Sequence, residues 1–94
     1  MGWRAIIPTA SGSRYLQQLC KHWGHKFAVE FTPEAGRIDF PMGAIEMAAD
    51  AAALTVTLRP APEADGAKFQ QVVADHLNRF AHREGELGFD WQAV

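Results

Sequence analysis

Two hydrophobic periodicities divide the chain into helical and extended segments. Between Arg14 and Trp23 the apolar residues recur every three or four positions, as in a helix with one buried face. A second helical pattern begins near Asp65, whose side chain can cap the helix. The apolar face of that helix comprises Phe69, Val72, Val73, His76, Leu77 and Phe80. Gly24 and Gly85 are the predicted helix ends, since glycine accepts the left-handed backbone common there.

Elsewhere apolar and polar residues alternate, which is typical of strands with one buried face. The alternating segments are residues 3–7, 27–31, 38–40, 45–47, 54–58 and 87–91. Proline, glycine and small polar residues at 32–36, 40–43 and 50–53 predict tight turns between the four central strands. The predicted order is therefore strand, helix, four strands, helix, strand.

This order predicts an α+β fold for a single domain, residues 1–94. Each element has one apolar face, so both helices are expected to pack on one face of a mainly antiparallel sheet, as a two-layer sandwich. The connectivity β-α-β-β-β-β-α-β is similar to the TATA-binding-protein-like or helix-grip arrangement. That is a likeness of fold, and it implies no function.

Composition excludes several function classes. A formal net charge of -2 and the absence of a Lys/Arg cluster argue against nucleic-acid binding. No apolar run approaches the roughly 20 residues that cross a bilayer, so no membrane association is expected. Residues 1–4 lack the features of a signal peptide, and a single cysteine cannot form an internal disulfide. The expected location is the cytoplasm.

Familiar catalytic arrangements are also missing. The chain has no glycine-rich phosphate loop and no G-x-S-x-G motif, and Ser11 and Ser13 are explained as helix caps. Cys20, His22 and His25 spell C-x-H-x-x-H, but positions 20 and 22 of a helix lie about 160° apart around its axis. Cys20 is therefore predicted to be a core residue. Enzymatic activity is not expected, and the sequence identifies no cofactor.

His76 is the unusual residue of the second helix, because it falls among apolar neighbours. A buried imidazole needs a partner for its N–H. One interpretation is a core histidine bonded to a backbone carbonyl or to Tyr15. The other is a ligand-binding or proton-handling group in a cleft between the helices. His22 could face the same cleft, and Arg14 and Arg83 could line its ends.

The strand register suggests a second candidate site. Matching the apolar residues of neighbouring strands places Phe31 opposite Ile38, Val29 opposite Phe40, and Phe40 opposite Ile45. A bulge at Gly43 would break this register.

In this register three carboxylates, those of Glu30, Asp39 and Glu46, align across adjacent strands on the outer face. Like charges directly opposite one another are unfavourable. Either Arg37 and Arg59 on the same face relieve them, or the row binds a hard cation such as magnesium or calcium.

Three segments together resemble a known family. They read RYLQQLCKHWGHK over residues 14–26, GRIDFPMG over 36–43 and DHLNRFAHRE over 75–84. This is similar to the bacterial family called domain of unknown function 2218, which has no established activity. The resemblance implies a bacterial protein with a role near iron–siderophore handling. It also implies that His22, His25 and His76 occupy the family's histidine positions, whereas His82 replaces a usual aromatic and lies outside any site.

The first functional hypothesis is a binding module for a small anionic molecule or a metal chelate. His22 and His76 would give directional contacts or bind the metal, and Arg14 and Arg83 would supply charge. Glu30, Asp39 and Glu46 are weaker metal candidates. The second hypothesis is a homodimer formed through the outer sheet face without a ligand site, although the polar residues on that face count against it. The third is an enzyme that uses His76 as acid or base.

Overall fold

The structure is a computed structural model and describes residues 2–94. Its elements, in chain order, are β1 (Trp3–Pro8), α1 (Gly12–Trp23), β2 (Ala28–Phe31), β3 (Ala35–Phe40), β4 (Gly43–Ala49), β5 (Ala53–Pro60), α2 (Gly66–Phe80) and β6 (Gln92–Ala93). The predicted α+β fold and element order are confirmed. Among the described helices, none is both long and apolar enough to cross a membrane.

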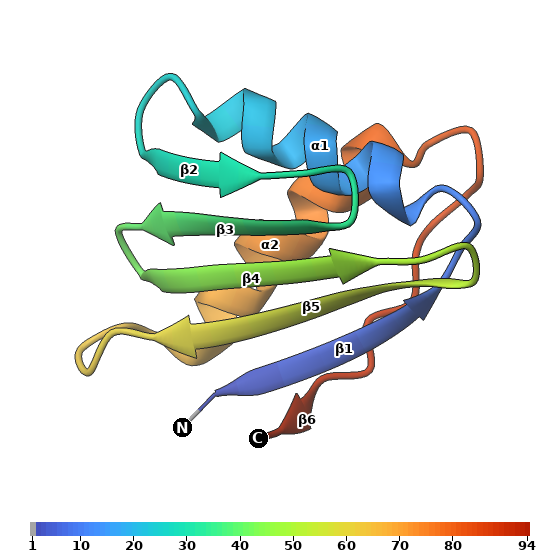
Figure 1. The fold of residues 1–94 in the computed structure, drawn as a ribbon. Helices are drawn as coiled ribbons and strands as arrows, with labels where there is room; N and C mark the ends of the chain where they lie inside the picture. Colours follow the sequence, from blue (N-terminus) through green and yellow to red (C-terminus); the bar gives the residue numbers. More distant parts are fainter. Residues whose placement is uncertain (1) are drawn as a thin grey trace.

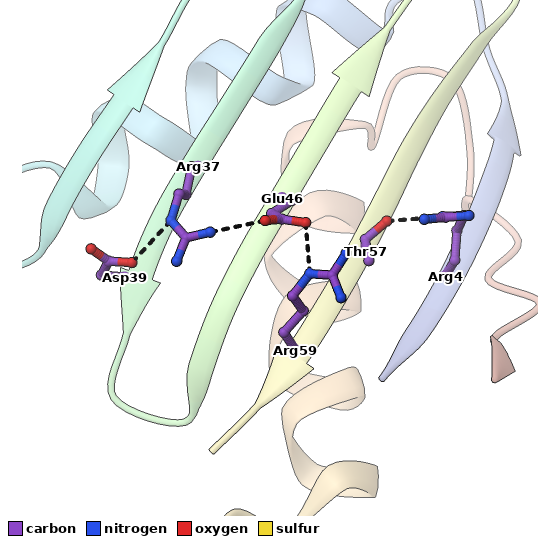
Figure 2. A network of polar contacts seen from close by, with 6 residues as sticks. All are labelled: Arg4, Arg37, Asp39, Glu46, Thr57 and Arg59. Carbon is purple, nitrogen blue, oxygen red and sulfur yellow. Dashed lines mark hydrogen bonds and ion pairs between the residues drawn. The ribbon is translucent and has the colours of Figure 1, made fainter. Parts of the chain in front are cut away.

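One antiparallel sheet carries both helices on the same face (Figure 1). Its strand order is β2-β3-β4-β5-β1-β6, so the predicted meander of four strands is continuous from β2 to β5. Strand β1 lies between β5 and β6, which come from distant parts of the chain. The second face of the sheet is not covered by either helix (Figures 1 and 2).

The core lies between the helices and the inner face of the sheet. Cys20 of α1 is fully buried, as predicted for a core residue. Gly36 of β3 faces it, and a Cβ at that position would lie 3.0 Å from the Cys20 sulfur. Glycine at position 36 therefore lets α1 pack closely on β3.

The helix boundaries are only partly as predicted. The Asp65 carboxylate caps α2 by accepting the Lys68 N–H at 3.2 Å, which confirms the predicted start. Gly24 does end α1, but its φ of -64° is right-handed, so the expected left-handed backbone is wrong. The predicted α2 end at Gly85 is also wrong, because the helix ends at Phe80. The Asn78 side chain accepts the Leu87 N–H at 2.6 Å, which turns the chain back.

The last strand is shorter and later than predicted. Residues 87–91 are not a strand, and β6 consists of Gln92 and Ala93 only. The rings of Phe89 and Trp91 stack with centres 5.6 Å apart. Both border a cavity of about 240 Å³ together with residues of α2. The alternation of Leu87, Phe89 and Trp91 with exposed residues therefore reflects packing on the core and α2 and not strand pairing.

The predicted register is wrong by two residues in both hairpins. Ile38 pairs with Val29 and with Ile45, and neither Phe31 nor Phe40 has the predicted partner. The physical reason is that the turns are shorter than expected. The first turn is closed by the Thr32 N–H, which donates to the Ala35 carbonyl at 2.7 Å. A two-residue shift keeps each side chain on its predicted face, because the side-chain period of a strand is two.

Gly43 allows the second hairpin to close tightly. Its φ is +141°, a conformation that favours glycine. It pairs with Phe40 across the turn and with Pro60 of β5, and a Cβ there would overlap the Arg59 carbonyl. The strand ladder continues through Gly43 in the same register, so no bulge interrupts it.

Candidate functional site

His76 lies at the border of the buried face of α2. The buried residues of the helix are Phe69, Val73 and Leu77. His76 is half-buried, like Val72 and Phe80, which lie one turn to either side of it. His76 therefore lies at the edge of the predicted apolar face and not among its buried residues. The ring lies between core and solvent.

One nitrogen of His76 is used within the helix. Its Nδ1 lies 2.8 Å from the carbonyl oxygen of Val72, four residues earlier. A carbonyl only accepts hydrogen bonds, so Nδ1 carries a proton, and Nε2 offers a lone pair when the ring is neutral. The predicted bond to a backbone carbonyl is confirmed for this nitrogen, whereas Tyr15 bonds to a different residue. The interactions described for residues 2–94 leave Nε2 available to a ligand.

His22 of α1 lies beside His76. The two ring centres are 5.4 Å apart, and the ring planes are tilted by 47°. His22 is exposed and lies in the last turn of α1, so its side chain can reorient. The structure therefore brings together two imidazoles that are 54 positions apart in the sequence, one from each helix.

The surroundings keep His22 neutral. Desolvation lowers its pKa below the usual 6.5, and the charges of His76, Arg79, Lys26 and His25 lower it further. A neutral imidazole presents a lone pair, which metal binding requires. Arg79 and Lys26 also make the local field positive, which favours an anion.

Aromatic side chains form the wall behind the two histidines. The ring centre of Trp23 lies 4.7 Å from that of His76, and Phe80 lies 6.0 Å from His22. Trp23 in turn lies 4.4 Å from Phe40 of β3, and Phe40 stacks on Phe69. The site is therefore backed by the core, and the backing ring Trp23 is itself only 6% exposed.

The two arginines expected to line the site lie elsewhere. Arg14 is in the first turns of α1, eight residues from His22 and so about 12 Å along the helix axis. It lines a separate cavity of about 480 Å³ with Gln17 and Lys21. Arg83 is exposed in the turn after α2.

Two other cations act on His22, and sequence reasoning missed both. They are Arg79, three positions after His76, and Lys26, four positions after His22. Side chains three or four positions apart share one face of a helix, so the spacing of Arg79 was a usable signal. Lys26 follows the end of α1, and its position depends on the turn at Gly24.

The carboxylate row on the outer face does not form. Glu30 is opposite Arg37, and Asp39 is opposite Ala44, because of the shorter turns. Both oxygens of Glu46 accept hydrogen bonds at 2.9 Å, one from Arg37 and one from Arg59, as Figure 2 shows. Arg37 and Arg59 therefore pair with Glu46, and Arg37 also with Asp39, although the three carboxylates do not align as the prediction required.

The structure also contains a polar cluster that the sequence did not indicate. One carboxylate oxygen of Glu84 accepts hydrogen bonds from the Tyr15 hydroxyl and, at 2.9 Å, from the Thr9 hydroxyl. Burial and the bond to Glu84 raise the Tyr15 pKa above 10.0. The cluster ties the segment after α2 to the beginning of α1.

A metal at the histidine pair would have few protein ligands. Within residues 2–94 no group of three or more His, Cys, Asp or Glu side chains is arranged to hold a metal ion. His22 and His76 can therefore give two ligands, and the remaining ones must come from outside the chain.

Comparison with known proteins gives a family but no activity. A family model described as an uncharacterized protein conserved in bacteria (DUF2218) matches residues 4–92. Among solved structures, the chain is similar to the NMR structure of PA4090 from Pseudomonas aeruginosa, with 41% identity and a TM-score of 0.75. The similarity covers 97% of this chain and 94% of that one. None of the curated proteins matches.

Proposed function

The chain belongs to the DUF2218 family of uncharacterized bacterial proteins, and we propose that it is a non-enzymatic binding module for a metal complex with an anionic chelator. The site is the pair of imidazoles from α1 and α2. The observation that carries the proposal is the 5.4 Å separation of the His22 and His76 rings in a positive field.

The ring separation fits two ligands of one metal. With metal–nitrogen bonds of about 2.0–2.1 Å, ring centres lie about 4.5 Å apart at a 90° bond angle and about 5.2 Å apart at a tetrahedral angle. The observed 5.4 Å is slightly longer. A small rotation of the exposed His22 side chain closes the difference. His76 is held by its bond to Val72, which fixes the ring and leaves Nε2 as the ligand atom.

Two protein ligands favour a chelated metal over a bare ion. A zinc, nickel or copper ion needs four or more ligands, and dedicated protein sites supply most of them. A complex with two open positions needs only His22 and His76. The iron–siderophore role implied by the family resemblance fits only where the chelator leaves such positions, since a fully enclosed ion cannot accept imidazole.

The charge of the site favours an anionic complex. Arg79 and Lys26 both act on His22 as positive charges. They attract a complex whose chelator outweighs the metal charge, and they repel a free metal cation. Arg79 and Lys26 therefore favour an anionic metal complex over a free metal cation.

The test uses the untagged chain and nickel nitrilotriacetate, an anionic complex with two open positions. We expect calorimetric titration at neutral pH to show one site, and His22→Ala or His76→Ala to weaken it at least about tenfold. His25→Ala is the matched control, because His25 is an exposed histidine of the same region. Equal binding by all four proteins, or an equal loss in the control, overturns the proposal.

A second measurement tests the charge argument. Arg79→Gln should weaken binding of nickel nitrilotriacetate but strengthen binding of free nickel ions, because the removed charge attracts one and repels the other. Lys68→Gln changes the same charge in the first turn of α2 and should alter neither. Effects of the same sign on both probes would contradict an anionic chelate as the ligand.

A further inference from the structure

The uncovered face of the sheet carries an ordered pattern of charges. One row crosses the five strands from β2 to β1 and reads Glu30, Arg37, Glu46, Thr57 and Arg4. The next row holds Asp39 on β3, Ala44 on β4 and Arg59 on β5. On the other side lies a row of small and apolar residues, Ala35, Ala48, Thr55 and Ile6. Figure 2 shows the charged side chains of these rows other than Glu30, with the helices behind the sheet.

In the two charged rows, acidic residues on one side of β4 lie at the same distance from it as basic residues on the other side. Asp39 and Arg59 lie one strand to either side of β4 in one row. Glu30 and Arg4 lie two strands to either side in the other. In each pair one residue is acidic and the other is basic. Rotation by 180° about an axis parallel to β4, in front of this face, therefore places Asp39 opposite Arg59 and Glu30 opposite Arg4.

From this pattern we propose that the open face binds the same face of a second copy. The two-fold axis runs parallel to β4, midway between the two sheets. Asp39 then faces the partner's Arg59, and Glu30 faces the partner's Arg4, each twice by symmetry. Sheets of equal twist stack with aligned strands in this arrangement, about 10 Å apart.

The residues on the axis permit close approach. Ala44 and Ala48 of β4 face their own copies and have no bulk to hold the sheets apart. Glu46 also faces its copy, but each Glu46 is already bonded to Arg37 and Arg59, which offset its charge. The apolar row includes Ile6, which is 62% exposed in the single chain and is covered in the dimer.

The size of the face predicts a weak association. The five strands β1 to β5 have about six residues each and lie about 4.8 Å apart, which gives roughly 500 Å² per copy. A standard stable interface buries about 800 Å² per partner. Because charge pairs hold this interface, salt should weaken it. We expect a dimer with a Kd of about 100 µM at low salt.

The test is sedimentation of the chain at about 300 µM in about 20 mM and about 500 mM salt. We expect dimer in the first condition and monomer in the second. Asp39→Arg and Arg59→Asp should each be monomeric, because each puts like charges opposite one another twice. An equimolar mixture of the two variants should recover the dimer, since the mixed pair has opposite charges at both contacts.

Two controls make each outcome informative. Glu63→Arg reverses an exposed charge away from this face and should leave the dimer unchanged. Circular dichroism checks that each variant is folded, and Glu30→Arg with Arg4→Glu provides a second complementary pair. A monomeric wild type at low salt overturns the proposal, as does a mixture of folded variants that stays monomeric. Both results are independent of metal binding at His22 and His76.

Discussion

The ring of His76 lies 4.7 Å from the ring of Trp23, so the candidate site and the aromatic core share a wall. Events at His76 are therefore expected to change the environment of Trp23. The other two tryptophans, Trp3 and Trp91, lie in β1 and beside β6, on other elements.

Trp23 fluorescence should report binding at the histidine pair. In a Trp3→Phe, Trp91→Phe background, Trp23 is the only tryptophan, and its emission should fall when nickel nitrilotriacetate binds, since the metal is an efficient quencher at contact distance. The fluorescence titration should give the same Kd as calorimetry. Quenching that survives His76→Ala would show that the probe binds elsewhere.

Replacement of Trp23 by alanine should destabilise the fold strongly. The side chain is 6% exposed and contacts Phe27, Phe40 and His76, so the change should cost about 3–5 kcal/mol in the free energy of unfolding. Trp91→Ala is the comparison, because Trp91 is only half-buried, and it should cost less than about 2 kcal/mol. Urea denaturation measures both, and equal costs would contradict the central role of Trp23.

Stability should fall in mild acid because of His22. Its folded-state pKa is below 6.5, mainly through desolvation, so the unfolded chain binds a proton more readily. The contribution of His22 is therefore present above pH 6.5 and is lost as the pH falls below it. His22→Gln should flatten the dependence of the urea midpoint on pH between about 7 and 5. An unchanged pH dependence in His22→Gln would contradict this assignment.

The Cys20 thiol should be unreactive in the folded protein. It is fully buried, and burial raises its pKa to about 11, so almost no thiolate exists at neutral pH. A disulfide reagent such as Ellman's reagent should react only as the chain unfolds. Gly36→Ala should speed the reaction, because the added methyl group presses on the sulfur. Fast labelling of the native wild type would show that α1 opens locally.

Tyr15→Phe should remove a stabilising contact that the wild type itself loses at alkaline pH. The hydroxyl bonds to Glu84, and its loss should cost about 1–2 kcal/mol at neutral pH. The pKa of Tyr15 is raised, first by burial and then by Glu84, so its contribution is complete below pH 10.0 and is lost above it. The difference between wild type and variant in thermal unfolding should shrink above that pH. A constant difference would contradict the bond.

The faces of the strands were predictable because hydrophobic alternation determines them directly. Ile38, Ile45 and Val56 are buried, as their positions in the pattern indicate. The register was not predictable in the same way. It depends on how many residues each turn contains, and a pairing shifted by two residues has the same hydrophobic pattern. The predicted alignment of Glu30, Asp39 and Glu46 was wrong for this reason alone.

The candidate site could be predicted in part. Helical periodicity placed His22 and His76 near the border between the two helices, where the structure has them. The position of α2 around its own axis could not be read from the pattern, because the apolar stripe is wider than the buried face. Contacts such as Tyr15 with Glu84 join residues 69 positions apart and follow only from tertiary packing.

The place of β1 in the sheet has a consequence for how the chain folds. Strands β2 to β5 are joined by tight turns, so each can pair with the next through contacts between residues close in the sequence. Strand β1 must instead insert next to β5, some 50 positions away, before β6 can pair with it. Closing so long a loop is slow compared with forming a hairpin. We expect docking of β1 to limit the folding rate, so substitutions in β1 should slow refolding more than equally destabilising ones in α2.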